Sequence, residues 1–331
     1  MMKIGITGAS GHIGNNLVRE LIRTGYEVRV LVHRDVTALR GLDVEIFKGD
    51  VCNPDEVESF TNGLEVVYHL AARIFIRKYR SRQFLGENVT GTENIIRSCI
   101  RHHCRLIHFS SIHAFSPHPP DRVLNEGNDL VVHDKYYYNR SKALTHKMVL
   151  DATRKNGLQG VVLCPTAVLG PNDFKPSLLG GAILKMIQGR LPALVPGGYD
   201  WVDVRDVVHA AVAAATSQIS SEDFLLAGKW LSLPALYSTI RQYVPGLRKL
   251  PVIPGWLAAF GDPFLEYWSL INGREPLYTR DSMAFLNHSH RNISSDKARR
   301  MLGYSSRPIE ETIRDTVGWF QNVAQKTNED E

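Results

Sequence analysis

The feature that most constrains the fold is a glycine-rich turn near the start of the sequence. Residues 7–14 read Thr-Gly-Ala-Ser-Gly-His-Ile-Gly, between an apolar segment at Lys3–Thr7 and an amphipathic one at about Gly11–Thr24. Glycines in such a turn let the pyrophosphate of a dinucleotide approach a helix N-terminus, where unpaired N–H groups favour negative charge. A purely structural turn is the alternative, but the position between a strand and a helix favours a cofactor site. We expect its contacts at Gly8, Ser10, Gly11, His12, Ile13 and Gly14.

The first half of the chain alternates short apolar segments with longer amphipathic ones. The predicted strands are Lys3–Thr7, Glu27–Val32, Val44–Lys48, Val66–Leu70, Leu106–Ser111 and Gln159–Pro165. The predicted helices are about Gly11–Thr24, Asp55–Thr61, Phe84–His103 and Tyr136–Asn156. Regular β-α-β alternation predicts an α/β protein of the Rossmann type, with a doubly wound parallel sheet and helices on both of its faces.

The pattern changes after about Leu169, where proline and glycine become frequent. Helices are predicted there at Ser177–Gln188, Val207–Thr216, Pro234–Tyr243 and Pro308–Phe320. We expect residues 1–169 to form the dinucleotide-binding core and residues 170–331 to form mainly a smaller substrate lobe, with segments that return to the core. Its aromatic residues would either line an apolar pocket or pack the lobe's own core: Phe174, Tyr199, Trp201, Trp256, Phe260, Phe264, Tyr267 and Trp268.

Composition excludes several other classes of protein. Hydrophobic residues make up 44% and charged residues 22% of the 331-residue chain, which is typical of a globular protein. The net charge of +5 comes from scattered lysines and arginines, so we expect no nucleic-acid partner. No apolar run is long enough to span a membrane. The first strand leaves no room for a signal peptide and the cysteines fit no zinc spacing, so we expect a cytoplasmic protein with reduced thiols and no metal.

The end of the second strand bears on the choice of cofactor. An acidic residue there binds the ribose 2′-hydroxyl of NAD, whereas a cation accommodates the 2′-phosphate of NADP. Arg34 follows the strand and offers a forked set of donors to phosphate, which favours NADP. In the alternative, Arg34 is a solvated loop charge, Asp35 binds the ribose and the cofactor is NAD.

The candidate catalytic residues are Ser111, Tyr138 and Lys142. Residues 136–142 read Tyr-Tyr-Tyr-Asn-Arg-Ser-Lys, and only Tyr138 has a lysine four residues later, on the same face of a helix. A nearby ammonium lowers the pKa of a phenol, which can then exchange a proton with a carbonyl or an alcohol. Ser111 ends the fifth strand, where a hydroxyl can hold the substrate oxygen, and we favour it over Ser110. The alternative is that both serines cap the next segment. We expect no essential role for the nearby histidines: His108, His113, His118 and His133.

With these motifs in this order, the chain resembles the extended short-chain dehydrogenases/reductases, and most of all their dihydroflavonol-reductase and 3β-hydroxysteroid-dehydrogenase branch. The likeness runs nearly end to end and includes Val202–Val207 and Ser294–Tyr304. It implies a role for Tyr138 and Lys142 at the nicotinamide and for Asn88 in structure and proton relay. The further cofactor contacts that it implies are His33, Asp50, Val51, Leu70, Ala71, Ala72, Asn88, Pro165 and Val168.

The sequence departs from this family at two positions. His33 stands where the reductases usually have an NADP-selecting arginine, which leaves Arg34 as the expected phosphate ligand. The family's common glutamate after the catalytic lysine is missing, and Leu144-Thr145-His146 stands there. We expect no effect of the second departure on the chemistry.

Three functions are compatible with the resemblance. We favour a reductase or dehydrogenase that acts on a small, hydrophobic carbonyl or alcohol. A nucleotide-sugar epimerase would instead retain NAD and need an arginine for its substrate's pyrophosphate, for which Arg190, Arg241 and Arg274 are candidates. A non-enzymatic dinucleotide sensor would need no proton carrier, so Ser111, Tyr138 and Lys142 argue against it. The expected partners are a small-molecule substrate and, in a homodimer, a second copy of the chain.

Overall fold

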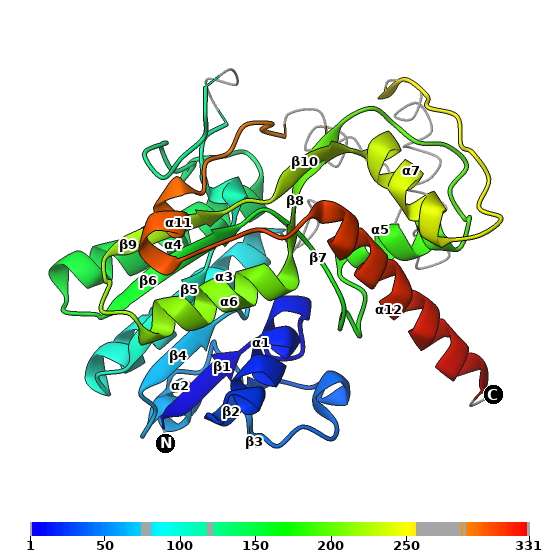
Figure 1. Ribbon diagram of the computed structural model, residues 1–331. Coiled ribbons are helices and arrows are strands. Elements are labelled where there is room, and N and C mark those ends of the chain that lie inside the picture. Colours follow the sequence, from blue (N-terminus) through cyan, green and yellow to red (C-terminus); the bar gives the residue numbers. More distant parts are fainter. Residues whose placement is uncertain (1, 74–80, 118–121, 256–285, 287–288, 330–331) are drawn as a thin grey trace.

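A seven-stranded parallel sheet forms the centre of the molecule (Figure 1). The computed structural model describes residues 2–73, 81–117, 122–255, 286 and 289–329. The strand order is β3-β2-β1-β4-β5-β6-β9. The strands are β1 (Lys3–Thr7), β2 (Glu27–Val32), β3 (Glu45–Lys48), β4 (Val66–His69), β5 (Arg105–Phe109), β6 (Gly160–Pro165) and β9 (Glu222–Leu226). The order reverses between β1 and β4, where the carboxyl ends of the strands open a crevice for ligands.

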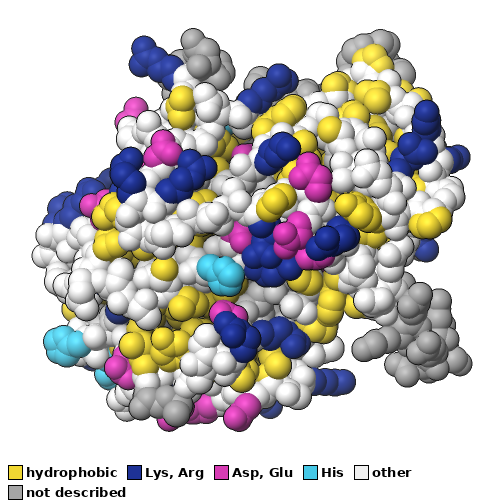
Figure 2. Space-filling model, in the orientation of Figure 1, with side chains coloured by type: hydrophobic (Ala, Val, Ile, Leu, Met, Phe, Trp, Pro, Cys, Tyr) yellow, Lys and Arg dark blue, Asp and Glu magenta, His cyan; other side chains and the backbone are white. Residues whose placement is uncertain are grey.

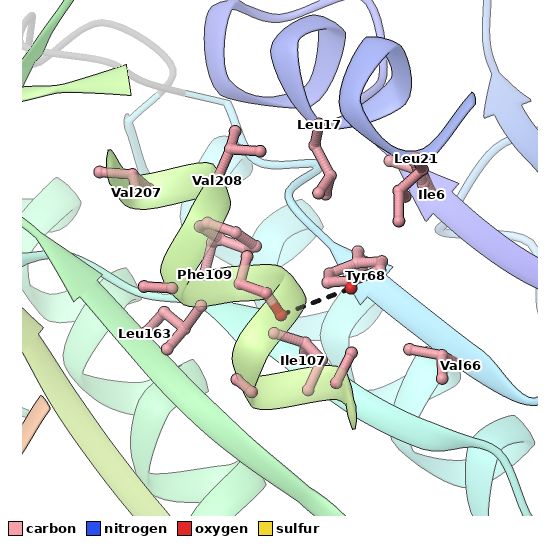
Figure 3. Packing of buried hydrophobic residues seen from close by; sticks show 14 of the residues in the cluster. Ile6, Leu17, Leu21, Val66, Tyr68, Ile107, Phe109, Leu163, Val207 and Val208 are labelled. Carbon is pink, nitrogen blue, oxygen red and sulfur yellow. Dashed lines mark hydrogen bonds between the residues drawn. The ribbon is translucent and has the colours of Figure 1, made fainter. Parts of the chain in front are cut away.

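Helices cover both faces of this sheet. One face carries α1 (His12–Arg23), α6 (Val204–Thr216) and α11 (Asp296–Leu302). The other carries α2 (Pro54–Thr61), α3 (Ser81–Arg101) and α4 (Tyr137–Lys155). Figure 3 shows the first layer, in which Leu17 of α1 and Val208 of α6 lie over Ile6, Tyr68 and Ile107 of the strands. Burial on both faces explains why the central strands β4, β5 and β6 are mostly apolar.

The later half of the chain builds a second, smaller layer. β7 (Ala167–Leu169), β8 (Gly198–Asp203) and β10 (Lys229–Ser232) form a three-stranded sheet in the order β10-β8-β7. Around it lie α5 (Leu178–Ile187), α7 (Leu233–Tyr243) and α12 (Ile309–Glu329), which share their own buried apolar core. On the face shown in Figure 2, basic and acidic side chains are interspersed.

The predicted fold class is confirmed. Every strand and helix predicted in the first half is present, with ends that shift by a few residues. Five elements were not predicted from the sequence: β7, β8, β9, β10 and α11. Of the aromatic residues, Trp201 packs in the core of the smaller layer and Phe174 is exposed. Trp256, Phe260, Phe264, Tyr267, Trp268, Arg274 and His118 lie outside the described residues.

The described parts of the chain contain no candidate for a membrane-spanning helix or a metal-ion site. No helix there is long and apolar enough to cross a membrane. No group of three histidine, cysteine, aspartate or glutamate side chains is placed to hold a metal ion in those same ranges. All four cysteines are free thiols.

Candidate active site and cofactor cleft

The glycine turn joins β1 to α1 and closely approaches the end of β4. Gly8 has a φ of +76°, and a Cβ atom there would lie 2.7 Å from the backbone nitrogen of Ala71. A Cβ atom on Gly14 would lie 2.2 Å from the carbonyl oxygen of Gly8. Glycine is therefore required at both positions. Gly11 precedes α1 without any side-chain cap, so N–H groups of the first helical turn are open to an anion.

A cleft of about 250 Å³ opens beside this turn. The carboxyl ends of β1, β2 and β4 and the segment after β3 form its walls. It contains many of the residues predicted to bind the cofactor: Gly8, Ser10, Gly11, His33, Arg34, Asp50, Val51 and Ala71. Asp35, the alternative ribose ligand, also lines it, together with four residues that were not among the expected contacts: Ala9, Leu31, Val32 and Gly49. Apolar strand ends together with open N–H groups fit the adenosine and pyrophosphate of a dinucleotide.

Charged side chains stand at the rim of the cleft. The Asp35 carboxylate accepts a hydrogen bond from the backbone N–H of Thr37 at 2.9 Å, and the Thr37 hydrogen bonds are the main cause that lowers its pKa. The charges of Lys175 and Arg40 lower that pKa further. Arg34 is exposed and makes no hydrogen bond or ion pair with any residue that the structure describes. Asp35 thus already has a backbone partner, whereas the Arg34 guanidinium is available to a ligand.

A buried hydrogen-bonded line supports the end of β4. The Thr7 hydroxyl shares a hydrogen bond with His69 Nδ1 at 2.8 Å and accepts one from the Ala71 N–H at 3.2 Å. His69 Nε2 lies 3.1 Å from the hydroxyl of Thr92 on α3. Burial lowers the pKa of His69 to about 3, so the ring is neutral at physiological pH. This line fixes the strand end that faces the cleft.

Asn88 and His33, two other predicted cofactor contacts, connect segments around the crevice through polar contacts. Asn88 on α3 accepts a hydrogen bond from the Arg73 N–H at 2.8 Å and donates one to the Arg73 carbonyl at 3.1 Å. Asn88 Nδ2 also lies 3.4 Å from the Ser141 hydroxyl, which links α3 to α4. His33 Nδ1 is 3.6 Å from the Asp50 carboxylate at the cleft. Ala72 is exposed beside the Asn88 contact.

Ser111 and Tyr138 meet at the carboxyl end of β5. A side-chain hydrogen bond with Ser111 acts on the phenol of Tyr138, which is half-buried in the first turn of α4. Burial raises the pKa of Tyr138, and the Ser111 bond lowers it by less. The Ser111 oxygen also accepts the His113 N–H at 3.2 Å, so this residue is both a cap and part of the site. Ser110 instead points to the Lys142 carbonyl, at 3.4 Å.

Lys142 lies one turn after Tyr138 and is buried. Its Nζ donates a hydrogen bond to the Phe109 carbonyl at 2.9 Å, which directs the ammonium to β5. Burial lowers the pKa of Lys142 to about 8. We expected Lys142 to lower the pKa of Tyr138, but this pKa is raised. Burial of the phenol has a larger effect than the contacts that lower the pKa. Nζ retains further N–H groups for a ligand hydroxyl.

Two histidines near the site have roles that sequence reasoning did not assign. The ring of His113 lies 6.0 Å from that of Tyr138 in an edge-to-face arrangement, and burial lowers its pKa to about 4. His146, where the family has glutamate, is fully buried; its Nε2 lies 3.0 Å from an Asp223 oxygen and its Nδ1 3.7 Å from Cys164 Sγ. The His146–Asp223 pair joins α4 to β9.

The remaining predicted contacts do not line this cleft. Pro165 ends β6, and Val168 lies in β7 beside Val202. Ile13 and Leu70 pack against the apolar core on the α1 face of the sheet. The side chain of His12 turns away from the cleft, and its Nε2 bonds to the Pro171 carbonyl at 3.0 Å. The His12 side chain therefore ties α1 to the loop after β7.

The fold and the site together define a class of protein. A parallel sheet with a glycine turn after β1, a cleft beside that turn and a Ser–Tyr–Lys group where β5 ends and α4 begins is the architecture of nicotinamide-dependent short-chain oxidoreductases. The family model described as "NAD dependent epimerase/dehydratase family" matches residues 4–227. The chain belongs to this family, within the extended short-chain dehydrogenases/reductases, and is an NAD(P)-dependent oxidoreductase.

Relatives match the chain over nearly its whole length. It is 32% identical to sterol demethylase protein B of Methylococcus capsulatus, over 96% of this chain and 97% of that protein. It is 26% identical to a putative dihydroflavonol 4-reductase of Synechocystis, over 96% and 94%. It is also 26% identical to the mouse sterol-4-alpha-carboxylate 3-dehydrogenase, decarboxylating, over 97% and 91%. Among solved structures, gox2253 superposes with a TM-score of 0.82 at 26% identity and covers 97% of this chain and 98% of its own.

Proposed function

We propose that the protein interconverts a secondary alcohol and a ketone with NADP(H), and that Ser111, Tyr138 and Lys142 carry the chemistry. The observation that carries this proposal is the meeting of the Ser111 hydroxyl and the Tyr138 phenol at the strand end that faces the crevice. The cofactor, when bound, supplies or accepts the hydride. The glycine turn, whose close backbone approach excludes side chains, and the adjoining cleft fit its adenosine and pyrophosphate.

In reduction, Ser111 holds the carbonyl oxygen of the substrate by donating its hydroxyl proton in a hydrogen bond. Tyr138 gives its phenolic proton to that oxygen as negative charge develops there. Lys142 holds the nicotinamide ribose through its ammonium and stabilises the phenolate that remains. Oxidation of an alcohol runs through the same steps in reverse.

Two of the relatives support a sterol-like substrate. Both are named for sterols, and the mouse enzyme's name places the reacting carbon 3 beside carbon 4, which bears a carboxylate. We infer that the substrate is a bulky, apolar secondary alcohol with a carboxylate on the neighbouring carbon. Its oxidation would give a 3-keto acid, which loses carbon dioxide as the bond to the carboxyl carbon breaks and the neighbouring carbon takes up a proton.

A product assay tests this proposal. A 3-hydroxysteroid with a 4-carboxylate is incubated with the protein and NADP, and the rise in nicotinamide absorbance and the released carbon dioxide are measured. We expect turnover of this compound and none of UDP-sugars. Turnover of a UDP-sugar without net cofactor reduction would instead establish the epimerase. As a control, the same steroid without its carboxylate shows how much the carboxylate contributes to turnover.

The preference for NADP over NAD is also a proposal. It is supported by Arg34, which is free at the rim of the cleft, and by Asp35, which already accepts a backbone hydrogen bond. We expect tighter binding of NADPH than of NADH, and we expect Arg34→Ala to lose about 1.5–3 kcal/mol of NADPH binding because a charge-assisted hydrogen bond disappears. Equal dissociation constants for the two cofactors in the unmodified protein would refute this preference.

The remaining proposals concern the organisation and location of the chain. We propose that residues 170–331 form mainly the substrate-binding part and that the protein works in the cytoplasm as a homodimer. Four free cysteines support a reducing compartment. Sedimentation equilibrium of the full chain measures the oligomeric state.

A further inference from the structure

Helix α1 brings two distant segments of the chain together at the adenosine cleft. On one side, Ser10 donates its hydroxyl proton to the Asp35 carbonyl at 2.6 Å, and Asn15 Nδ2 donates to the Ala38 carbonyl at 2.6 Å. These bonds fix the segment after β2 that carries Arg34. On the other side, Asn16 Nδ2 donates to the Pro171 carbonyl at 3.0 Å. The glycine turn and the first two turns of α1 thus hold both segments.

The loop that follows Pro171 is also held firmly. Asn172 donates to the Asn16 side chain at 3.0 Å, and Phe174 packs between Arg19 of α1 and Trp319 of α12. A tight turn follows, because the Asp173 carboxylate accepts the backbone N–H of Ser177 at 3.0 Å and its hydroxyl at 2.8 Å. The backbone on both sides of Lys175 is therefore fixed relative to α1.

Lys175 stands in that turn, directly after Phe174. It is exposed and forms no hydrogen bond or ion pair with any described residue. Its charge acts on the carboxylate of Asp35, as does that of Arg40, although hydrogen bonds from Thr37 have the larger effect on that pKa. Since Asp35 lines the cleft next to Arg34, the ammonium of Lys175 contributes to the potential at the same rim.

We propose that Lys175, contributed by the later half of the chain, is a further determinant of cofactor choice that attracts the 2′-phosphate of NADP at the rim where Arg34 and Asp35 lie. This inference rests on the proposed preference for NADP. A phosphate at the rim carries close to two negative charges, which Arg34 alone does not balance. Lys175 offers a point charge on a flexible stem and needs no fixed geometry to act.

The experiment measures dissociation constants of the full chain for NADPH, NADH and adenosine 2′,5′-bisphosphate. We expect Lys175→Ala to weaken NADPH and the bisphosphate about threefold to fivefold at low ionic strength, as for an exposed charge pair. The binding of NADH should not change, and added salt should reduce the effect by screening it. Lys175→Arg should restore binding. Lys185→Ala, on α5 and away from the cleft, is the matched control and should leave all three constants unchanged.

The possible results separate this inference from the proposal on which it rests. An unmodified protein that binds NADPH and NADH equally overturns both. If Arg34→Ala weakens NADPH while Lys175→Ala does not, only the role of Lys175 is overturned. If Lys175→Ala weakens the binding of NADPH and NADH equally, the role of Lys175 is also overturned, because the lysine would then act on a group that both cofactors share.

Discussion

At the scale of single residues, the site depends on how burial and a few hydrogen bonds act on Tyr138 and Lys142. Burial raises the pKa of the phenol and lowers that of the ammonium to about 8, so the ammonium loses its proton at a lower pH than the phenol does. The Ser111 bond is the described contact that works in the opposite direction on Tyr138. Proton transfer by Tyr138 therefore depends on Ser111 and Lys142, and substitutions that remove single functional groups can test each role.

Tyr138→Phe keeps the ring and removes the proton. We expect cofactor binding close to normal and a kcat lower by at least about a hundredfold, the usual effect of a positioned acid. The measurement is single-turnover hydride transfer, followed by the loss of nicotinamide absorbance. Tyr136→Phe and Tyr137→Phe are controls, since neither has a lysine four residues later. Full activity of Tyr138→Phe together with loss in Tyr137→Phe would show that the catalytic residue is misassigned.

The pH dependence of kcat/KM should follow the protonation state of Lys142. Lys142 is charged below its pKa of about 8 and neutral above it. We expect kcat/KM for carbonyl reduction to fall as pH rises through that value, because the ammonium that stabilises the phenolate is lost. Lys142→Arg keeps its charge to much higher pH and should move the fall upward, whatever its absolute rate. A profile with the same midpoint in both proteins would assign the titration to another group.

At the scale of the elements, the glycine turn sets how closely α1 approaches β1 and β4. Gly14→Ala would place a Cβ atom 2.2 Å from the Gly8 carbonyl oxygen. We expect a loss of about 1–3 kcal/mol in the free energy of unfolding from this overpacking, together with much weaker NADPH binding. Urea denaturation and cofactor titration measure the two effects.

Gly318→Ala is the matched control for that change. Gly318 lies within α12, and a Cβ atom there would have nothing within 4 Å. Alanine favours a helix over glycine, so we expect this variant to gain about 0.5–1 kcal/mol and to bind NADPH normally. If the two variants have the same stability and the same affinity for NADPH, the close backbone approach at the glycine turn contributes to neither.

Elements with a strong local pattern could be predicted, and those that depend on distant partners could not. β1 and β2 have the predicted bounds because long apolar runs stand between clear turns. β7 has three residues and β8 begins with Gly198-Tyr199-Asp200, so neither shows strand periodicity by itself. The Tyr138–Lys142 spacing was visible in the sequence, whereas the place of His113 beside Tyr138 follows from the short helical turn after Ser111, which no periodicity marks.

At the scale of the whole molecule, a partly buried ion pair attaches the segment before α12 to α6. Asp206 on α6 is buried and accepts three hydrogen bonds from Arg307, which precedes α12: from the backbone N–H at 2.8 Å, from Nε at 2.9 Å and from Nη2 at 2.7 Å. Arg307→Ala would leave this carboxylate without its side-chain partner. We expect a loss of about 3–5 kcal/mol in the free energy of unfolding.

A surface pair of the same chain provides the comparison. Lys229 and Glu310 lie 3.5 Å apart and both side chains are mostly exposed. Lys229→Ala should cost at most about 1 kcal/mol. Guanidinium denaturation of the two variants compares the pairs directly, and similar losses would contradict the view that burial makes the Asp206 pair important.

The place of β9 at the edge of the large sheet has a consequence for how the protein is made. The ribosome completes every residue of the cofactor cleft and the Ser–Tyr–Lys group well before it reaches Glu222–Leu226. Until that strand emerges, β6 is an open edge with apolar residues on both of its faces, the kind of surface that pairs with other chains. A gene fragment that encodes only residues 1–169 should therefore yield aggregates rather than a small cofactor-binding protein.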